Sequence, residues 1–410
     1  MSDDRRIQPR TLRGFNDYLP EQAARRQWLM ERLRHVFEQW GYQPLETPAL
    51  EYADVLLGRY GAEAEKLIYR FKDLGDRDVA LRYDQTVPFA RVVAQYHDLP
   101  KPFRRYQFQR VWRGENTGRG REREFTQCDV DVAGTASPVA DAETLAVAAA
   151  GYHAIGFERV RLRLNDRTVF DDLGLAKQEV IALDKLDKIG ADGVVRELVA
   201  LGRDEEAATD LLARLQAAQP PPRLKEVMAV ARDLGTPDEV LEFDPTLARG
   251  LDYYTSTVFE VWSPDYTAGS LGGGGRYDGL IRRFTGRDIP AVGFSFGLER
   301  VVEALEAVGG FAGFRAAPQA IAIALGRGHL AWAGEVAARL RAAGVSVAVS
   351  TEPDAGAGKQ LAAADKLGAR YAILVGENEA AAHQAALKDL KSGQQETLAL
   401  DALAARLVGA

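Results

Sequence analysis

An arginine beside two tyrosines and an acid lies shortly before a run of glycines in the second half of the chain. The first stretch, RGLDYYT, covers residues 249–255, and the second, GGGGRYDG, covers residues 272–279. Glycine lets backbone N–H groups approach a ligand closely, and arginine presents a fixed fork of donors matched to carboxylate or phosphate. Together the stretches predict a site for a small aromatic or polar ligand beside a phosphate. Either stretch alone is equally compatible with a tyrosine-rich strand followed by a loose loop.

A second concentration of charge lies between residues 104 and 134. It contains seven arginines, at positions 104, 105, 110, 113, 119, 121 and 123. If residues 123–133 form a strand, alternation places Arg123, Gln127, Asp129 and Asp131 on one face and Cys128 on the other, core-facing side. The first face can hold a zwitterion and a triphosphate together. The alternative is a solvated strand face with ordinary surface ion pairs.

These residues need strands and helices to position them. Residues 103–112 and 123–133 alternate like two strands, with a long turn between them. Apolar residues at helical spacing predict an amphipathic helix over residues 22–40. Residues 42–50 contain Pro44 and Pro48, which favour an edge strand over a central one.

The residue composition and the apolar spacing change twice in the later part of the chain. Residues 171–238 are rich in Ala, Leu, Lys, Glu and Asp at a spacing near 3.6, which predicts a helical insertion broken by three prolines at 220–222. Strand and glycine signals return over residues 247–296, and a helix is expected over residues 297–308. The glycine-rich stretch that begins at residue 309 predicts a linker.

Beyond the linker, short apolar runs alternate with helical patterns. The apolar runs are residues 320–325, 345–349 and 371–375, and the helical patterns are residues 332–343 and 359–367. Alternation of strands and helices predicts a parallel or mostly parallel sheet in an α/β unit able to fold by itself.

Composition limits the class of protein. A chain of 410 residues is expected to form two or three domains. Its 46% hydrophobic and 27% charged residues are typical of soluble globular proteins, and no stretch approaches the ~20 apolar residues that a membrane span needs. The single cysteine excludes an internal disulfide, and the polar N-terminal residues lack a signal core, so we expect a cytoplasmic protein. The net charge of −7 argues against coating nucleic acid by bulk charge but permits a local basic groove.

Several stretches resemble the motifs of a known enzyme class. Residues 46–51, 112–125 and 293–300 are similar, in that order, to motifs 1, 2 and 3 of class II aminoacyl-tRNA synthetases. Other stretches resemble the histidyl-tRNA synthetase family specifically: residues 81–90, 127–131, 249–255 and 272–279. The resemblance spans nearly the whole chain.

The resemblance implies a fold and a domain order. It implies an α+β catalytic domain built on an antiparallel sheet, the class II synthetase fold, from residues 1–170 and 239–308. A helical insertion domain would cover residues 171–238, a linker residues 309–318, and an α/β anticodon-binding domain residues 319–410.

The resemblance also implies an activity: ATP-dependent ligation of L-histidine to its tRNA, tRNA(His), through a histidyl-adenylate. Mg²⁺ would accompany ATP, no protein ligand for a metal is assigned, and the chain would form a homodimer through the motif 1 region. A different class remains open, because related paralogues bind histidine as regulatory subunits of ATP phosphoribosyltransferase and do not charge tRNA. Such paralogues typically lack the C-terminal domain and some motif residues. A protein that only binds nucleic acid would leave the substrate motifs without purpose.

Roles for individual residues follow from the same resemblance. Arg113 and Arg249 would flank the α-phosphate of ATP as the catalytic pair, and Arg113 would also bind the substrate carboxylate. The histidine ammonium group would be held by Asp84, Thr86 and Gln127. The imidazole ring would be read or lined by Asp131, Tyr254 and Tyr277. ATP would also contact Glu115, Arg121 and Arg300.

The chain departs from the family's pattern in the motif 2 region. Glu122 stands where the family usually has an aromatic residue facing ATP. The loop over residues 116–119 lacks the family's usual proline, and Asp84 is one methylene shorter than the glutamate of many bacterial members.

Overall fold

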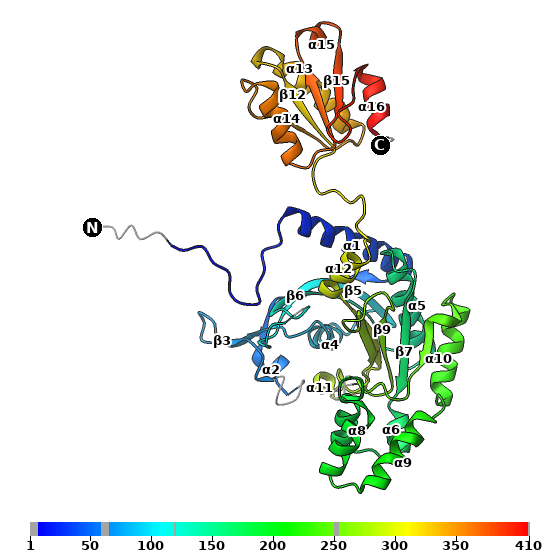
Figure 1. Cartoon of the computed structure of the whole chain (residues 1–410). Coiled ribbons are helices and arrows are strands. Elements are labelled where there is room, and N and C mark those ends of the chain that lie inside the picture. Colours follow the sequence, from blue (N-terminus) through cyan, green and yellow to red (C-terminus); the bar gives the residue numbers. More distant parts are fainter. Residues whose placement is uncertain (1–6, 59–64, 119, 250–253, 409–410) are drawn as a thin grey trace. The chain divides into compact units, whose positions relative to one another are not determined.

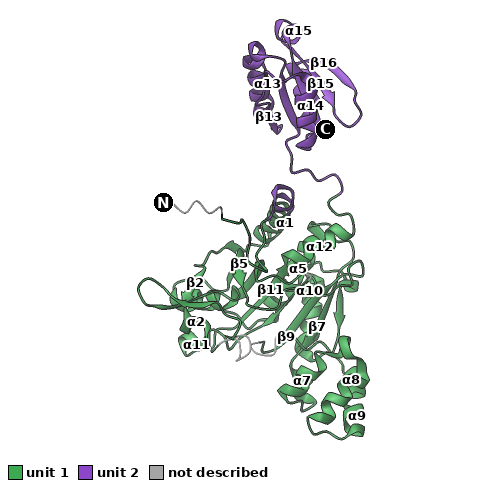
Figure 2. Ribbon diagram, turned by 60° about the vertical axis from the view of Figure 1, so that its left-hand side comes forward, with its two compact units in different colours: residues 1–17, 26–311 green, residues 18–25, 312–410 purple. Residues whose placement is uncertain are grey.

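The computed structural model describes residues 7–58, 65–118, 120–249 and 254–408 (Figure 1). The chain divides into two compact units: residues 1–17 with 26–311, and residues 18–25 with 312–410 (Figure 2). Helix α1, Pro20–Gln39, crosses this division and matches the helix expected over residues 22–40. Each unit contains its own sheet.

The larger unit is built on an eight-stranded sheet with the order β1-β5-β6-β11-β10-β9-β7-β8. In that order the strands are Gln43–Pro44, Phe103–Trp112, Glu124–Ala133, Ala291–Gly297, Gly272–Arg276, Thr257–Trp262, Arg161–Asp166 and Leu241–Phe243. The six strands from β5 to β7 pair antiparallel, and the outer strands β1 and β8 pair parallel with their neighbours. The antiparallel sheet confirms the expected fold class, and Pro44 lies on an edge strand as expected.

Helices cover one face of this sheet. Cys128 and Val130 of β6 are fully buried on that face. Helix α5, Pro138–Ala154, packs against β6 and β11, as does α12, Leu298–Ala307. Phe296 joins the layers, because its ring lies 5.6 Å from that of Phe37 in α1 and 4.8 Å from that of Tyr152 in α5. The alternate residues of β6 face the other way, toward the site described below.

Smaller elements border the opposite face. Helix α4, Thr86–Gln95, forms a core with α2, Ala53–Leu56, and with residues that precede α11, Arg282–Thr285. A three-stranded antiparallel sheet lies in the same part of the unit, with the order β2-β4-β3. Its strands are Leu50–Tyr52, Asp78–Leu81 and Arg70–Lys72.

The stretch predicted as a helical insertion is helical, and its helices divide into two groups. Helices α6, Thr168–Asp172, α7, Lys177–Leu183, α8, Leu186–Ala200, and α9, Glu205–Gln216, enclose a separate apolar core that includes Val194, Leu198 and Leu211. Helix α10, Pro222–Asp233, begins at the last of the three prolines and packs along α5. A short 3-10 turn, Asp238–Val240, then leads into β8.

The smaller unit holds a five-stranded sheet with the order β13-β12-β14-β15-β16. The strands are Val347–Val349, Ala320–Ala324, Tyr371–Val375, Gln384–Asp389 and Gln395–Ala399. The first three pair parallel, as predicted, whereas β15 and β16 extend the sheet antiparallel and were not anticipated. The helices of the unit are α13, Leu330–Ala342, α14, Ala357–Lys366, α15, Glu377–Ala381, and α16, Leu400–Val408, with a 3-10 turn at Arg327–His329. In the described ranges of the chain, no helix combines the length and apolar character that crossing a bilayer requires.

Candidate active site

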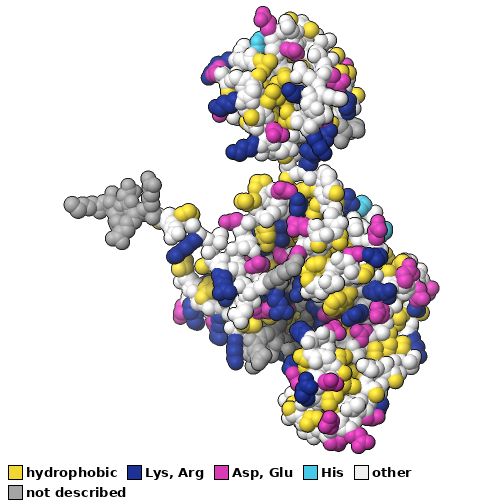
Figure 3. All heavy atoms as spheres, in the orientation of Figure 1, with side chains coloured by type: hydrophobic (Ala, Val, Ile, Leu, Met, Phe, Trp, Pro, Cys, Tyr) yellow, Lys and Arg dark blue, Asp and Glu magenta, His cyan; other side chains and the backbone are white. Residues whose placement is uncertain are grey.

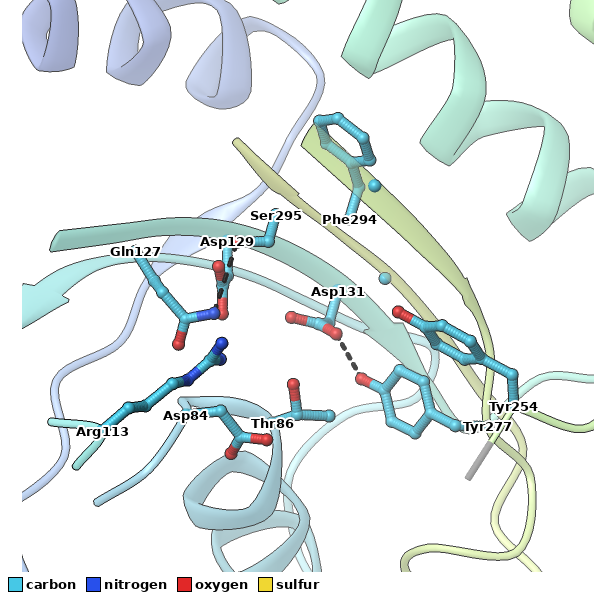
Figure 4. A pocket seen from close by; sticks show the side chains of 12 residues that line it. Asp84, Thr86, Arg113, Gln127, Asp129, Asp131, Tyr254, Tyr277, Phe294 and Ser295 are labelled. Carbon is cyan, nitrogen blue, oxygen red and sulfur yellow. Dashed lines mark hydrogen bonds between the residues drawn. The ribbon is translucent and has the colours of Figure 1, made fainter. Parts of the chain in front are cut away.

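The open face of β6 forms one wall of a small cavity of about 60 Å³ (Figure 4). Side chains from β6 face the start of α4 across it, and Arg113 approaches from the motif 2 region. The lining residues are Asp84, Thr86, Arg113, Gln127, Asp129, Asp131, Tyr254, Gly273, Tyr277, Gly293, Phe294 and Ser295. All six residues predicted to hold histidine therefore come together here, joined by Asp129 and Arg113. The predicted alternation of β6 is confirmed, but its polar face is buried at Asp129 and Asp131 and half-buried at Gln127, so it is not a solvated face.

Asp131 is an acid of the cavity that has a partner on each of its two oxygens. Its Oδ1 atom accepts a hydrogen bond from the hydroxyl of Tyr277, and its Oδ2 atom lies 2.7 Å from Nη2 of Arg105 (Figure 4 shows the bond to Tyr277). Burial raises the pKa of Asp131 to about 7, against the opposing influence of Arg105. Near neutral pH this carboxylate can accept an N–H from a ligand, with its orientation already fixed on two sides.

Arg105 is one of the seven arginines between residues 104 and 134, and the family resemblance implies no role for it. It lies directly opposite Asp131 in the register of β5 with β6, and its side chain is fully buried. The alternation of the two strands was readable from the sequence, whereas their register was not. A cross-strand pairing of opposite charges is the signal that could have found it.

The residues predicted to bind the ammonium group of histidine line the same cavity as Asp131 and Tyr277. The Oε1 atom of Gln127 is buried and has no hydrogen-bond donor among the described residues. Asp84 accepts the N–H of Val87 at 3.0 Å and so caps the first turn of α4, next to Thr86. Burial raises the pKa of Asp129 to about 6, with the guanidinium of Arg105 opposing it. A buried acceptor without a donor is unusual and marks a place for a ligand N–H.

The small cavity shares residues with a much larger cleft of about 1400 Å³. Figure 3 shows the hollow in the larger unit, with Lys and Arg side chains gathered around it. Arg113 and Arg249 both line this cleft, so the predicted cationic pair faces one shared hollow. Glu115, Arg121 and Arg300, predicted to contact ATP, line it as well, and so does Glu122.

Arg113 is held by the residues around it. Its Nε donates to the carbonyl oxygen of Tyr83 at 3.1 Å. Its guanidinium lies 4.5 Å from the ring centroid of Tyr83 and 5.0 Å from that of Phe125. Cation–π contacts on two aromatic rings restrict the guanidinium to one region at the mouth of the small cavity.

Arg249 is the one arginine of residues 249–255, and its partners come from other parts of the chain. Arg249 forms an ion pair with Glu260 of β9 and lies 3.3 Å from the hydroxyl of Ser270. A Cβ atom at position 273 would lie 2.8 Å from its Cζ atom. The four consecutive glycines lie in strand β10, Gly272–Arg276, and not in a loop, and the absence of a side chain at Gly273 makes room for Arg249 against the sheet.

The remaining predicted contacts of ATP are anchored at the edge of the cleft. Nη1 of Arg300 donates to the carbonyl oxygen of Ser270 at 2.9 Å. Oε1 of Glu115 accepts the hydroxyl of Tyr83 at 3.1 Å. Asp252 and Tyr253 of the arginine–tyrosine stretch, and Arg119 of the motif 2 loop, lie outside the described residues.

The antiparallel sheet with motif residues on β6, β10 and β11 defines a class II aminoacyl-tRNA synthetase fold. Residues 14–301 match the sequence profile of the family described as Histidyl-tRNA synthetase, and residues 319–409 match that of the Anticodon binding domain. The chain belongs to the histidyl-tRNA synthetase family.

Individual relatives agree over nearly the full length. A histidine–tRNA ligase of Aeropyrum pernix is 40% identical over 400 residues, which cover 91% of each chain. One from Wolinella succinogenes is 38% identical over 444 residues, covering 100% of each. The crystal structure of histidyl-tRNA synthetase from Nostoc sp. PCC 7120 superposes with a TM-score of 0.87 at 32% identity, covering 98% of this chain and 99% of that one.

Proposed function

We propose that this protein condenses L-histidine with ATP to give histidyl-adenylate and then transfers the histidyl group to tRNA(His). The observation that carries the proposal is the buried pair of Asp131 and Tyr277 in a small cavity, opening toward a cleft lined by Arg113 and Arg249. The cavity suits a compact polar ring, and the cleft suits a nucleotide triphosphate. Membership in a synthetase family implies the use of ATP.

The cavity offers complementary partners for histidine. A neutral imidazole presents one N–H donor and one nitrogen acceptor. Asp131 accepts the N–H, and the hydroxyl of Tyr254 serves the other nitrogen. The ammonium group meets Asp84, Thr86 and the unpaired Oε1 of Gln127. A pocket that must hydrogen-bond a ring rejects phenylalanine or leucine by roughly 10⁴-fold, because its polar groups would be left unpaired.

Adenylation then needs positioning and charge neutralisation. A carboxylate oxygen of histidine attacks the α-phosphorus, the bond from that phosphorus to the β-phosphate oxygen breaks, and pyrophosphate leaves. Arg113 and Arg249 stabilise the charge on the α-phosphate oxygens, with donors already fixed by Tyr83 and Glu260. Arg121, Arg300 and Glu115 hold the remainder of the nucleotide.

Mg²⁺ would arrive with the outer phosphates of ATP. Within the described ranges, no group of three or more His, Cys, Asp or Glu residues is arranged to hold a metal ion. Mg²⁺ bound with ATP keeps several waters and takes most of its ligands from phosphate, so it needs only one or two carboxylates from the protein. Carboxylates that line the cleft, Glu115 among them, would supply those few protein ligands. When bound, the ion neutralises charge on the leaving pyrophosphate.

Transfer to tRNA involves the rest of the chain. A terminal ribose hydroxyl of the tRNA attacks the carbonyl carbon of the adenylate, and AMP leaves. The unit that matches the anticodon-binding profile, residues 319–409, would bind the anticodon. We further propose a homodimer through the motif 1 region, because Leu50, Tyr52 and Phe71 of the small sheet are 42%, 55% and 46% exposed. Neighbouring exposed apolar side chains favour a protein partner.

Histidine-dependent exchange of labelled pyrophosphate into ATP tests the proposal, followed by charging of tRNA. We expect exchange with L-histidine and none with other amino acids. Equal exchange with several amino acids, or none with any, would refute the activity. A regulatory paralogue would bind histidine without supporting exchange. The retention of Arg113, Arg249, Arg300 and the C-terminal unit favours the ligase.

A further inference from the structure

Arg105 is a buried cation that the proposed reaction does not yet use. Its side chain is fully buried in β5, beneath the wall of the small cavity. Across the sheet, the register places Arg105, Asp131 and Gly293 in one row on β5, β6 and β11. Asp131 therefore has a guanidinium on one side and a residue without a side chain on the other.

The contacts of Arg105 are almost all polar. Nη2 lies 2.7 Å from Asp131 and 3.9 Å from Asp129. Nη1 donates to Gln107 Oε1 at 3.1 Å and to Gln85 Oε1 at 3.4 Å. The guanidinium also sits 4.8 Å from the ring centroid of Phe89 in α4.

The charges around the cavity explain why this cation is needed. Three carboxylates line it, from Asp84, Asp129 and Asp131, and Tyr254 and Tyr277 add two phenols. Arg113 lines both the small cavity and the larger cleft, where the proposed reaction places the α-phosphate of ATP. Buried carboxylates that share a site take up protons unless a cation compensates them. Arginine stays charged inside proteins, so Arg105 is the permanent counter-charge on the inner side.

We propose that Arg105 determines specificity for histidine by keeping Asp131 ionised and oriented, so that the cavity reads a ring N–H. Arg105 does not reach the substrate; it acts through Asp131 as a positioning residue. The ion pair to Oδ2 and the hydroxyl of Tyr277 on Oδ1 hold the carboxylate from two sides. The carboxylate lines the cavity and in this orientation can accept a ring N–H. This inference rests on the proposed function and adds the source of its selectivity.

The test compares Arg105→Met with Arg105→Lys in pyrophosphate exchange and in calorimetric titration of L-histidine. For Arg105→Met we expect the histidine KM and Kd to rise by about 100-fold, the scale for removing one partner of a buried charge pair. The KM for ATP should stay within about threefold. Arg105→Lys keeps the positive charge but lacks the planar guanidinium, so its histidine KM and Kd should be about tenfold lower than those of Arg105→Met. Arg104→Met is the matched control, because Arg104 points to the other face of β5 and pairs with Glu143.

The pH profile separates this role from a merely structural one. In Arg105→Met, the pH at which histidine affinity falls by half should move upward by about one unit, because Asp131 loses its counter-charge. In Asp129→Asn this pH midpoint should move downward, because the neighbouring negative charge is gone and Arg105 then faces Asp131 as its one carboxylate partner among the described residues. The titration of histidine itself is identical in every variant, so differences report the protein. Asp129→Asn also provides the test if Arg105→Met fails to fold.

The outcomes can be told apart. A folded Arg105→Met with wild-type histidine affinity, or a pH midpoint that moves in neither variant, overturns the role of Arg105. Parallel losses for histidine and ATP would show a general structural effect and also overturn it. If the wild-type protein shows no histidine-dependent exchange, the proposed function itself fails, whatever the variants do.

Discussion

Gly293 faces Asp131 across β11 and β6 so closely that a Cβ atom at position 293 would lie 1.8 Å from Oδ1 of the acid. Only glycine leaves space for the carboxylate in its present position. We predict that Gly293→Ala raises the histidine KM by at least about 100-fold, because Asp131 must swing away from Tyr277. Pyrophosphate exchange at varied histidine measures this. Gly279→Ala is the control, since a Cβ there meets nothing within 4 Å. An unchanged KM in Gly293→Ala would show that Asp131 does not read the ring.

Arg249 is the cation with the strongest expected effect on chemistry. We predict that Arg249→Ala lowers the rate of adenylate formation by about 10³-fold, the scale for losing a preorganised donor to transition-state charge. Single-turnover formation of adenylate measures it, with circular dichroism to verify folding. Glu260→Gln removes only the partner that holds Arg249 and should cost less. Near-wild-type adenylation in Arg249→Ala would mean that another group stabilises the α-phosphate.

The carboxyl of Asp131 should make histidine binding sensitive to pH. Its pKa of about 7 means that acid conditions protonate it and remove the acceptor for the ring N–H. Binding of a histidine analogue with a triazole ring, which stays neutral over this range, should weaken as the pH falls through 7. Asp131→Asn should bind weakly at every pH. A flat profile in the wild-type protein would contradict the assignment.

The carboxyl of Asp131 should also make stability depend on pH, but stability should decrease with rising pH whereas ligand binding increases. Because the pKa of Asp131 is raised on folding, the folded protein binds a proton that the unfolded chain has released between about pH 4 and pH 7. The contribution of Asp131 to the free energy of unfolding is therefore greatest in acid and decreases as the pH rises through 7. Urea unfolding of the wild type and Asp131→Asn at pH 5 and pH 7.5 measures this difference.

The N-terminal segment should position the motif 2 loop. The carbonyl oxygen of Gly14 accepts the N–H groups of Arg123 and Glu124 at 2.9 and 3.1 Å, and a Cβ there would lie 2.7 Å from Cγ2 of Thr117. We predict that Gly14→Ala raises the KM for ATP by about tenfold and leaves the KM for histidine unchanged. Gly41→Ala is the control, because Gly41 has a similarly positive φ but no neighbour within 4 Å. If Gly41→Ala raised the KM for ATP as much as Gly14→Ala, backbone strain alone would explain the effect, and the positioning role of Gly14 would be contradicted.

Removal of residues 312–410 should separate the two steps of the reaction. The catalytic site lies wholly within the larger unit, so adenylate formation is expected to persist. Charging of tRNA should become less efficient, because the unit that matches the anticodon-binding profile is gone. Unchanged charging kinetics would exclude a tRNA role for this unit.

The strands that carry the site were predictable because their chemistry is local. The alternation of β5 and β6 is visible in the sequence, and with it the shared face of Gln127, Asp129 and Asp131. The pairing of Arg105 with Asp131 was not visible, because the register depends on how the long connection closes. The pairing of Arg249 with Glu260 was not visible either, because Arg249 lies outside the strands and its partner is decided by tertiary packing.

Other differences reflect burial that local pattern does not reveal. Strand β16 is mostly exposed on both faces, so it lacks the apolar alternation that marks a strand. The insertion reads as one helical stretch, yet α10 packs along α5 while α7 to α9 share their own core. Which apolar face meets which partner is decided by tertiary packing and not by spacing.

Strand β10 limits how this protein can be made more thermostable. Glycine weakens a strand because it restricts the unfolded chain so little. Replacing glycine by alanine is a common stabilising change, but strand β10 has no space for the added methyl groups. A methyl group at position 274 would fall 2.1 Å from the carbonyl oxygen of Gly293, and one at position 272 would fall 2.5 Å from the hydroxyl of Tyr152. Gains in heat resistance must therefore come from the covering helices and the surface, while the centre of the sheet keeps its bare backbone.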